Sequence, residues 1–338
     1  MTEPTDTQAP STGFAELGDM LSYLQTQAVN LPQAIKEPGD LPPVAPPVDT
    51  AVLRQEIAGL KAALLDEFRS FQVYGFSAQQ APMLLREVTR CRELTFRAMQ
   101  EGSGEAVDTD RFDSSYYHIV VWDTATDSVV GGYRLGRTDE ILARQGQQGV
   151  YLGEMFDFAP EFFDGSPTLE IGRSFVVPDY QRHHYSLYLL WRGIGQFVVR
   201  HPQYRDVYGV VSMSRLYDPT TIAALKDALV VPDTDVQPKA PYEPNLGTPW
   251  QDFVQGQRPL EMKLVSQLVR GLEGDARDVP VLIRHYHKLG ARFVSAAVDS
   301  SFNNTPGLLL KLHVPAIPHK YLKQYLGEDG VAAYLAAG

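Results

Sequence analysis

A carboxylate and a guanidinium interrupt an otherwise apolar run at residues 169–177. Glu170 and Arg173 stand three positions apart in this run, whose other residues are typical of a core strand. Because side chains alternate between the two faces of a strand, the pair falls on opposite faces unless a bulge re-aims one of them. A bulge opens a slot for a ligand, so the run predicts either a binding site or a partly buried ion pair.

The segments before this run carry further polar residues that could serve the same site. They are Arg92 and Phe96 in a predicted helix, Glu105, Asp108, Asp110 and Asp113 in an acidic cluster, and Arg134 in a predicted strand. The carboxylates could hold the amino group of a zwitterionic acceptor, and the arginines its carboxylate. The cluster is equally consistent with a solvated loop, and the arginines with partners for these acids.

The elements that must position these residues follow from periodicity and turn signals. We expect strands at residues 71–74, 116–123, 128–135, 169–177, 207–213, 291–298 and 307–313, and helices at 51–64, 82–99 and 187–200. The strands at 116–123 and 128–135 are joined by a polar turn and predict a hairpin. The strand, helix, strand order over 169–213 needs a crossover and therefore a parallel pair. The fold class is α/β (α+β), with a mixed sheet flanked by helices.

This arrangement of residues resembles the branch of the GNAT superfamily that makes N-acyl amino acids, in particular the ornithine lipid synthases. The resemblance covers roughly residues 70–330 and is partly shared by acyl-homoserine-lactone synthases. It implies a splayed GNAT-like sheet and transfer of a long, 3-hydroxylated or plain, acyl chain to the α-amine of an amino acid such as ornithine. It also implies substrate-binding roles for Arg92, Phe96, Asp110, Asp113 and Arg134.

Two other functions stay open at this point. The first is an acyl-homoserine-lactone synthase, although the chain is longer than that core and lacks a Trp in the loop after Phe96. The second is a binding module without activity that kept the fold. Retention of both Glu170 and Arg173 favours an enzyme over such a module.

Acyl transfer from a thioester needs an unprotonated amine, stabilisation of an oxyanion and a proton for the leaving thiolate. We expect Glu170 to be the base, with Arg173 beside it. The resemblance implies that Tyr217 is the general acid, although a tyrosine after a strand is often a packing residue. The oxyanion donors would be the backbone N–H groups of Ser174, Phe175 and Val176. With no nucleophile dyad in the sequence, direct attack in a ternary complex is favoured.

The identity of the acyl donor depends on the turn after Tyr180. Relatives that use coenzyme A hold its pyrophosphate with a glycine-rich turn at a helix N-terminus. Here His184 or Tyr185 and Ser186 or Leu187 occupy the glycine positions, which favours acyl carrier protein, through its acyl-phosphopantetheine, as co-substrate. The donor-site candidates in this stretch are Gln181, Arg182, Ser186 and Arg192. A surrounding basic stretch would suit an acidic carrier protein or anionic lipid, or would be an ordinary solvated helix face.

Composition narrows the class further. The 338 residues carry a net charge of −11, so we expect no nucleic-acid partner. The single cysteine, Cys91, excludes an internal disulfide, and the histidine spacing predicts no metal site. We also expect no permanently bound cofactor. With no apolar run of about 18 residues and no secretion signal, we expect a cytoplasmic protein that can contact the inner membrane face peripherally.

The predicted domain organisation is uneven. Residues 1–50 would be a flexible, proline-rich arm with an amphipathic patch at Phe14, Leu17, Leu21 and Leu24, which would dock on a membrane or partner or pack back on the domain. Residues 51–330 would form the acyltransferase domain, and 331–338 a tail. Within the domain, the proline-rich segment 231–260 is expected to be a surface excursion.

Overall fold

The computed structural model describes residues 13–163, 166–183, 185–274 and 277–337. They fall into two compact units. The larger unit lies within Pro32–Leu216, Val230–Tyr242 and Val281–Gly338, and the smaller within Met1–Leu31, Tyr217–Leu229 and Glu243–Pro280. No helix among the described residues combines the length and the apolar character needed to cross a bilayer.

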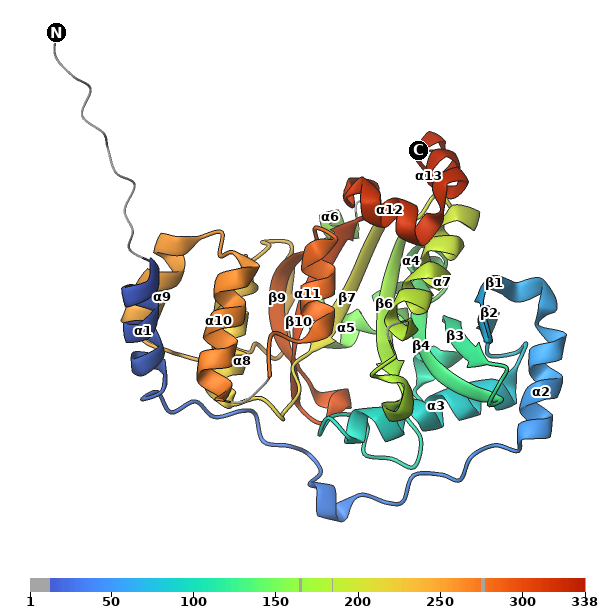
Figure 1. The fold of residues 1–338 in the computed structure, drawn as a ribbon, viewed down its shortest axis with the longest axis horizontal. Helices are drawn as coiled ribbons and strands as arrows, with labels where there is room; N and C mark the ends of the chain where they lie inside the picture. Colours follow the sequence, from blue (N-terminus) through green and yellow to red (C-terminus); the bar gives the residue numbers. More distant parts are fainter. Residues whose placement is uncertain (1–12, 164–165, 184, 275–276, 338) are drawn as a thin grey trace, which may run out of the picture. The chain divides into compact units, whose positions relative to one another are not determined.

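The larger unit is built on an eight-stranded sheet (Figure 1). Its strands are β1 (Leu64–Phe68), β2 (Phe71–Ser77), β3 (Tyr117–Asp123), β4 (Ser128–Arg137), β6 (Thr168–Val176), β7 (Asp206–Ser212), β9 (Arg292–Asp299) and β10 (Thr305–His313). Their order is β1-β2-β3-β4-β6-β7-β10-β9, and a second, two-stranded sheet pairs β5 (Phe156–Phe158) with β8 (Val236–Pro238). Every pair in the large sheet is antiparallel except β6 with β7, so the expected hairpin and parallel pair are confirmed.

Helices cover both faces of this sheet. They are α2 (Thr50–Gly59), α3 (Pro82–Arg97), α4 (Thr138–Gln145), α5 (Leu152–Met155), α6 (Pro160–Phe163), α7 (Ser186–Arg200), α11 (Val281–Lys288), α12 (His319–Leu326) and α13 (Glu328–Ala336). On β3, Val120 packs into one core cluster with residues of α3, whereas the next residue back, Ile119, lies against Gly193 of α7. Because neighbouring strand residues point to opposite sides, α3 and α7 lie on opposite faces.

The centre of the sheet is opened by a bulge and by a divergence of strands. Gly132 pairs with Phe175 and Arg134 with Gly172, so Arg173 and Ser174 of β6 together face a single residue of β4. This is the bulge that could bring Glu170 and Arg173 to one side. The parallel pairing of β6 with β7 ends at Ile171 and Gly209, after which the two strands separate.

The smaller unit contains α1 (Gly13–Leu24), α8 (Pro219–Leu229), α9 (Thr248–Gln257) and α10 (Met262–Glu273). Helix α1 contacts α9 and α10, and Leu24 is fully buried. Of the alternatives left open for the apolar stripe at Phe14, Leu17, Leu21 and Leu24, the structure fits the one in which the helix packs against other helices. Likewise, part of the expected surface excursion at 231–260 is helix α9, whose Trp250 is fully buried.

Two further expectations about the chain ends differ from the structure. The proline-rich segment before α2 is tied to the larger unit, because the backbone N–H groups of Ile35 and Lys36 both donate to Asn303 Oδ1 at 2.8 Å. The expected C-terminal tail at 331–338 is largely part of α13, anchored by Tyr334, which donates to the carbonyl of Tyr204 at 2.8 Å.

Candidate active site

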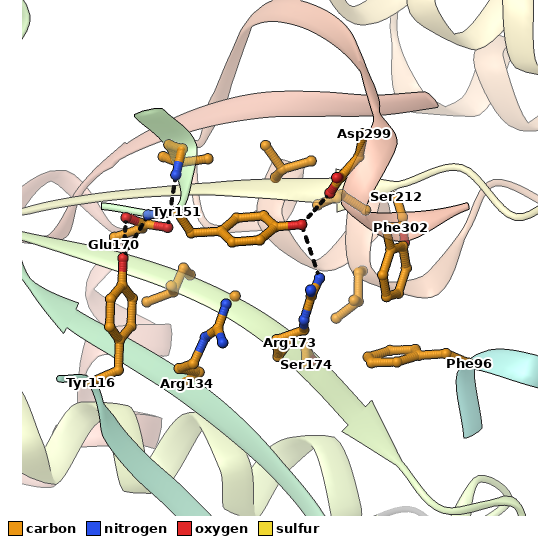
Figure 2. A pocket seen from close by; sticks show the side chains of 16 residues that line it. Phe96, Tyr116, Arg134, Tyr151, Glu170, Arg173, Ser174, Ser212, Asp299 and Phe302 are labelled. Atoms are coloured by element: carbon orange, nitrogen blue, oxygen red, sulfur yellow. Dashed lines mark hydrogen bonds between the residues drawn. The ribbon is translucent and has the colours of Figure 1, made fainter. Parts of the chain in front are cut away.

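A cavity lies in the larger unit where the bulge of β6 meets the gap between β6 and β7 (Figure 2). Its wall combines acids, arginines, tyrosines and two phenylalanines from distant parts of the chain. The lining residues include Phe96, Tyr116, Arg134, Tyr151, Glu170, Arg173, Ser174, Ser212, Leu282, Asp299 and Phe302. Of the candidates expected from the sequence, this brings together Glu170, Arg173, Ser174, Phe96 and Arg134.

Glu170 lies at one end of the cavity and is 3% exposed. One carboxylate oxygen, Oε2, accepts from the Tyr116 hydroxyl at 2.7 Å, and Oε1 accepts from the Leu152 backbone N–H at 3.2 Å. Burial raises the pKa of Glu170 to about 7, and these two hydrogen bonds and Arg134 only partly oppose the rise. A carboxyl with such a pKa can accept a proton near neutral pH.

Arg173 is held at the bulge in an unusual backbone conformation. Its φ is +50°, which lies in the left-handed region that side chains other than glycine rarely adopt. The guanidinium donates to the Tyr151 hydroxyl at 3.2 Å and lies 4.7 Å from the centre of the Phe302 ring. The Tyr151 hydroxyl in turn donates to Asp299 Oδ2 at 2.5 Å. The bulge thus aims a cation into the cavity, where it organises a tyrosine and a second buried carboxyl.

The acidic cluster forms a buried ion-pair network with the arginines. Arg92 binds Asp113 with two hydrogen bonds of 2.9 and 3.0 Å, and its Nε lies 2.9 Å from Asp108. Arg134 reaches Asp113 at 3.2 Å and Asp110 at 2.6 Å. Arg92 and Arg134 hold the pKa of Asp113 well below its usual range.

Two of the expected substrate-binding residues, Arg92 and Asp113, do not line the cavity, and they are 1% and 2% exposed. The ion-pair interpretation that the sequence left open therefore describes them. Asp110 also lies outside the cavity wall, but its second oxygen is 3.4 Å from Arg173, so the network supports the bulge from behind.

Several cavity residues carry no signal in the sequence that marks them as part of a site. Tyr116, Tyr151 and Asp299 have no spacing relative to Glu170 that would mark them, because they come from three separate segments. Asp299 had one usable signal, since it is a carboxylate directly after the strand expected at 291–298. A further buried carboxyl, Glu101, accepts from the Ser212 hydroxyl at 3.0 Å, and burial raises its pKa to about 7.

The residues that were expected to bind the acyl donor contact different parts of the protein. Gln181 donates to the Val176 carbonyl at 3.1 Å, and Ser186, at the start of α7, donates to the Tyr180 carbonyl at 3.0 Å. Arg192 is bound by Asp66 with two hydrogen bonds of 2.6 and 2.9 Å. Arg182 is exposed, and His184 lies outside the described residues. Phe175 is buried in the core of the larger unit.

Two residues with other expected roles are also placed. Tyr217 belongs to the smaller unit, where its hydroxyl donates to the Asp278 carbonyl at 2.7 Å, and its role as general acid stays a prediction. Burial raises the pKa of the Cys91 thiol to about 12, which keeps it protonated and unreactive. Within the described ranges, no three His, Cys, Asp or Glu side chains are arranged to hold a metal ion.

Comparisons with known proteins agree on one family. The acetyltransferase (GNAT) domain family matches residues 91–192. An L-ornithine N(alpha)-acyltransferase of Rhodobacter capsulatus is 30% identical over 259 residues, which cover 71% of this chain and 90% of the relative. A glycine N(alpha)-acyltransferase of Phocaeicola vulgatus is also 30% identical, over 183 residues and 51% of this chain. The match to that second relative spans only about half of its length, 56%.

Among solved structures, a CoA-dependent acyl-homoserine lactone synthase with SAM and isopentyl-CoA aligns with 78% of this chain and 98% of its own. The sequence identity is 13% and the TM-score is 0.37. So distant a likeness has no bearing on substrate or mechanism.

Proposed function

Because the chain belongs to the GNAT acyltransferase family, we propose that it transfers a long fatty acyl chain from acyl carrier protein to the α-amine of ornithine. The acyl chain would be plain or 3-hydroxylated, and the product would be an N-acyl amino acid of the lyso-ornithine-lipid type. Since such a product is an amphiphile, the enzyme would work in the cytoplasm and touch the inner membrane face peripherally.

The observation that carries this proposal is the buried Glu170 at the end of the cavity, with its pKa raised to about 7. An α-ammonium group has a pKa of about 8, so only part of it is neutral at physiological pH. Glu170 would take the proton from this ammonium, directly or through water, and release an amine able to attack. The amine nitrogen would then bond to the thioester carbonyl carbon while the C–S bond breaks and the thiolate leaves.

The opened sheet supplies a place for the thioester. Beyond Ile171 and Gly209 the strands β6 and β7 no longer pair, so the edge of β6 from Gly172 onward is free on that side. Successive N–H groups of a strand point to opposite edges, and that of Val177 donates to the Val130 carbonyl on the β4 side. Of the expected donors Ser174, Phe175 and Val176, the N–H groups of Ser174 and Val176 would therefore face the opened side and donate to the developing oxyanion. Because Cys91 is buried with a pKa of about 12, an acyl-cysteine route is disfavoured and direct transfer is supported.

The acceptor assignment rests on the better-covered relative. The relative named for L-ornithine is matched over 90% of its length, whereas the relative named for glycine is matched over 56%. The cavity also holds a carboxyl, Asp299, and a cation, Arg173, beside Glu170. This mixture of charges suits a zwitterionic amino acid with an additional ammonium group.

The donor assignment rests on the turn before α7. The helix begins at Ser186 without a glycine-rich turn, and a bulky Tyr185 precedes it. Close approach of a diphosphate to the backbone is disfavoured there, whereas the single phosphate of a phosphopantetheine arm needs less room. Arg192 is hydrogen-bonded to Asp66, so the positive charge available to attract a carrier protein comes from exposed residues such as Arg182.

The test is an assay of the purified protein with matched acyl donors and a panel of acceptors. Acyl carrier protein and coenzyme A carrying the same plain or 3-hydroxylated chain are each incubated with ornithine, lysine or glycine, and N-acyl products are measured by mass spectrometry. We expect N-acyl ornithine from the carrier protein. Equal turnover with the coenzyme A donor would overturn the donor assignment, and acylation of glycine alone would overturn the acceptor assignment.

A further inference from the structure

Two buried polar groups on the α7 face of the sheet have no hydrogen-bond partner among the described residues. They are the hydroxyl of Tyr133, on β4, and the indole N–H of Trp191, on α7. The two residues are 3% and 4% exposed, so bulk solvent does not reach them. A buried donor without an acceptor destabilises a fold, and two adjacent ones require an explanation.

These groups lie directly behind the cavity wall. Tyr133 is the single residue that faces Arg173 and Ser174 across the bulge, and its hydroxyl has Ser174, Trp191 and Tyr286 as polar neighbours. None of these neighbours meets hydrogen-bond geometry with it. The Tyr133 and Trp191 rings are 6.4 Å apart and the Trp191 and Tyr286 rings 5.5 Å apart.

Ser174 connects this buried group to the cavity. Its side chain lines the cavity beside Arg173 (Figure 2), together with Leu282 from α11, the helix that also carries Tyr286. Ser174 lies on β6 just beyond the point where β6 and β7 separate. The cavity therefore extends to the position where a thioester would enter, and Ser174 stands at that position.

The chemistry of the three groups fixes the direction of a hydrogen-bond chain. An indole N–H can only donate, so Trp191 must be the first member. A hydroxyl both accepts and donates, so Tyr133 can accept from Trp191 and donate to Ser174, and Ser174 then has its own hydrogen left to donate into the cavity. A chain of this polarity is complete only when the cavity holds an acceptor.

We propose that, when the acyl donor binds, Trp191, Tyr133 and Ser174 close into a donor chain whose last hydrogen bond, from the Ser174 hydroxyl, goes to the carbonyl oxygen of the acyl thioester. The inference rests on the proposed acyl transfer and adds a side-chain donor to the backbone donors of β6. Ser174 is the catalytic residue of the chain, while Tyr133 and Trp191 are positioning residues. As negative charge develops on the oxygen, each donor in the chain strengthens the next.

The burial of Tyr133 suits this role. Burial raises the pKa of its hydroxyl, so the group stays protonated and able to donate throughout the neutral range. No proton has to leave the chain, because the hydrogen bonds only stabilise charge on the oxygen. Ser174 is half-buried and lines the cavity, so a ligand there can reach its hydroxyl.

The test compares Tyr133→Phe, Ser174→Ala and the double variant with the wild type. Tyr133→Phe keeps the ring and should lower kcat about 10-fold with little change in the KM for the donor. Ser174→Ala should lower kcat by a similar or larger factor. The double variant should be no worse than Ser174→Ala alone, because both changes break the same chain.

A matched control separates this role from packing. Tyr334 is an equally buried tyrosine whose hydroxyl is satisfied, since it donates to the Tyr204 carbonyl at 2.8 Å. Tyr334→Phe should lower the melting temperature and leave kcat unchanged, whereas Tyr133→Phe should lower kcat and leave the melting temperature unchanged or higher. Wild-type kcat in Tyr133→Phe, or a loss of kcat that only accompanies a fall in melting temperature, overturns the inference.

A separate assay distinguishes a wrong proposed function from a wrong donor chain. Release of free thiol from the acyl donor is followed with hydroxylamine as a small acceptor, which requires no amino-acid recognition. If the wild type acylates no amino acid but releases thiol, and Tyr133→Phe lowers that release, the proposed acceptor is wrong and the donor chain stands. If thiol release is the same in both proteins, the donor chain is wrong whichever amino acid is acylated.

Discussion

Asp113 and Glu170 are both buried carboxyls of the larger unit, and they differ in what surrounds them. Asp113 binds Arg92 with two hydrogen bonds and also reaches Arg134, so its pKa is held well below the usual range. Among the described residues, Glu170 accepts hydrogen bonds from a phenol and a backbone amide, and burial raises its pKa to about 7. The charge of the Asp113 carboxylate is therefore balanced by arginines in direct contact, whereas that of Glu170 is not.

This difference separates residues that hold the site from residues that react in it. A carboxylate whose charge is balanced by arginines holds the surrounding side chains in place, but its oxygens are already bonded and do not bind a substrate. A buried carboxyl without a cationic partner in direct contact can exchange a proton near neutral pH. The sequence placed Arg92, Asp113 and Glu170 in one site, whereas the structure divides them between a supporting network and a cavity wall.

The largest expected effect is on the free energy of unfolding when the buried ion-pair network around Arg92 is broken. Arg92→Met removes the ion pairs of 2.9 Å to Asp108 and to Asp113, and leaves these buried carboxylates with the longer contacts of 3.2 Å to Arg173 and Arg134. We expect the free energy of unfolding to fall by about 3–5 kcal/mol, measured by urea denaturation. Arg111→Met is the control, because the Arg111–Glu154 pair is exposed and should contribute less than about 1 kcal/mol. Similar losses in both variants would mean that the network is not specially stabilising.

The second effect is on catalysis. Glu170→Gln keeps the shape of the side chain but removes the base, so kcat should fall by about 10²-fold or more while the fold is retained. In the wild type, kcat/KM should rise with pH through the pKa of about 7, and this rise should be absent in the variant. Glu101→Gln is the matched control, because Glu101 is also buried with a pKa of about 7 but does not line the cavity. Equal losses of kcat in the two variants would contradict a special role for Glu170.

The third effect is on the pH dependence of stability, and its sign differs between the two regions. Glu170 and Glu101 have pKa values raised to about 7, so the folded protein binds more protons than the unfolded chain between about pH 4.5 and 7. Their contribution to stability is present below pH 4.5 and is lost as the pH rises through 7, by up to about 3 kcal/mol for each group.

Asp113 has a lowered pKa, so its contribution is present at neutral pH and is lost only as the pH falls below the usual range for an aspartate. Burial also lowers the pKa of His118 and His285 to about 4, and their contribution to stability rises with pH over the same range, so the wild-type slope is the sum of opposing terms. Urea denaturation between pH 4.5 and 8 should therefore be compared between the two proteins, and stability should fall less, or rise more, with pH in Glu170→Gln than in the wild type. An unchanged slope in that variant would show that Glu170 is ionised as easily in the folded as in the unfolded chain.

Local patterns predicted much of the larger unit. The hairpin of β3 and β4, the parallel pair of β6 and β7, and helices α3 and α7 follow from alternation, turn residues and the crossover rule. Strand β1 was not expected, and its first residue, Leu64, was assigned to a helix because it continues the spacing of Leu53, Ile57 and Leu60; in the structure it pairs with β2.

The site was predictable only where its residues share one segment. The bulge could be anticipated, because Glu170 and Arg173 have a spacing that conflicts with a regular strand. Tyr151 and Asp299 join them through long-range contacts that no spacing records. The same limit applies to Arg192, whose charge was visible in the sequence while its partner Asp66, on β1, was not.

The smallest expected effect is on the KM for acyl carrier protein, and it compares a paired with an exposed arginine in the basic stretch around α7. Arg192 is compensated by Asp66, whereas Arg182 is exposed and has no ion pair within the described part of the chain. If acyl carrier protein docks here, Arg182→Glu should raise its KM about 3- to 5-fold and weaken the salt dependence, because an exposed charge steers an acidic partner. Arg192→Gln should change that KM less than about twofold, since its charge is already neutralised locally. Steady-state kinetics at two salt concentrations measures both variants. A larger KM effect for Arg192→Gln than for Arg182→Glu would mean that the carrier protein displaces Asp66 from Arg192. An ion pair within the protein would then not show that an arginine is unavailable to a partner.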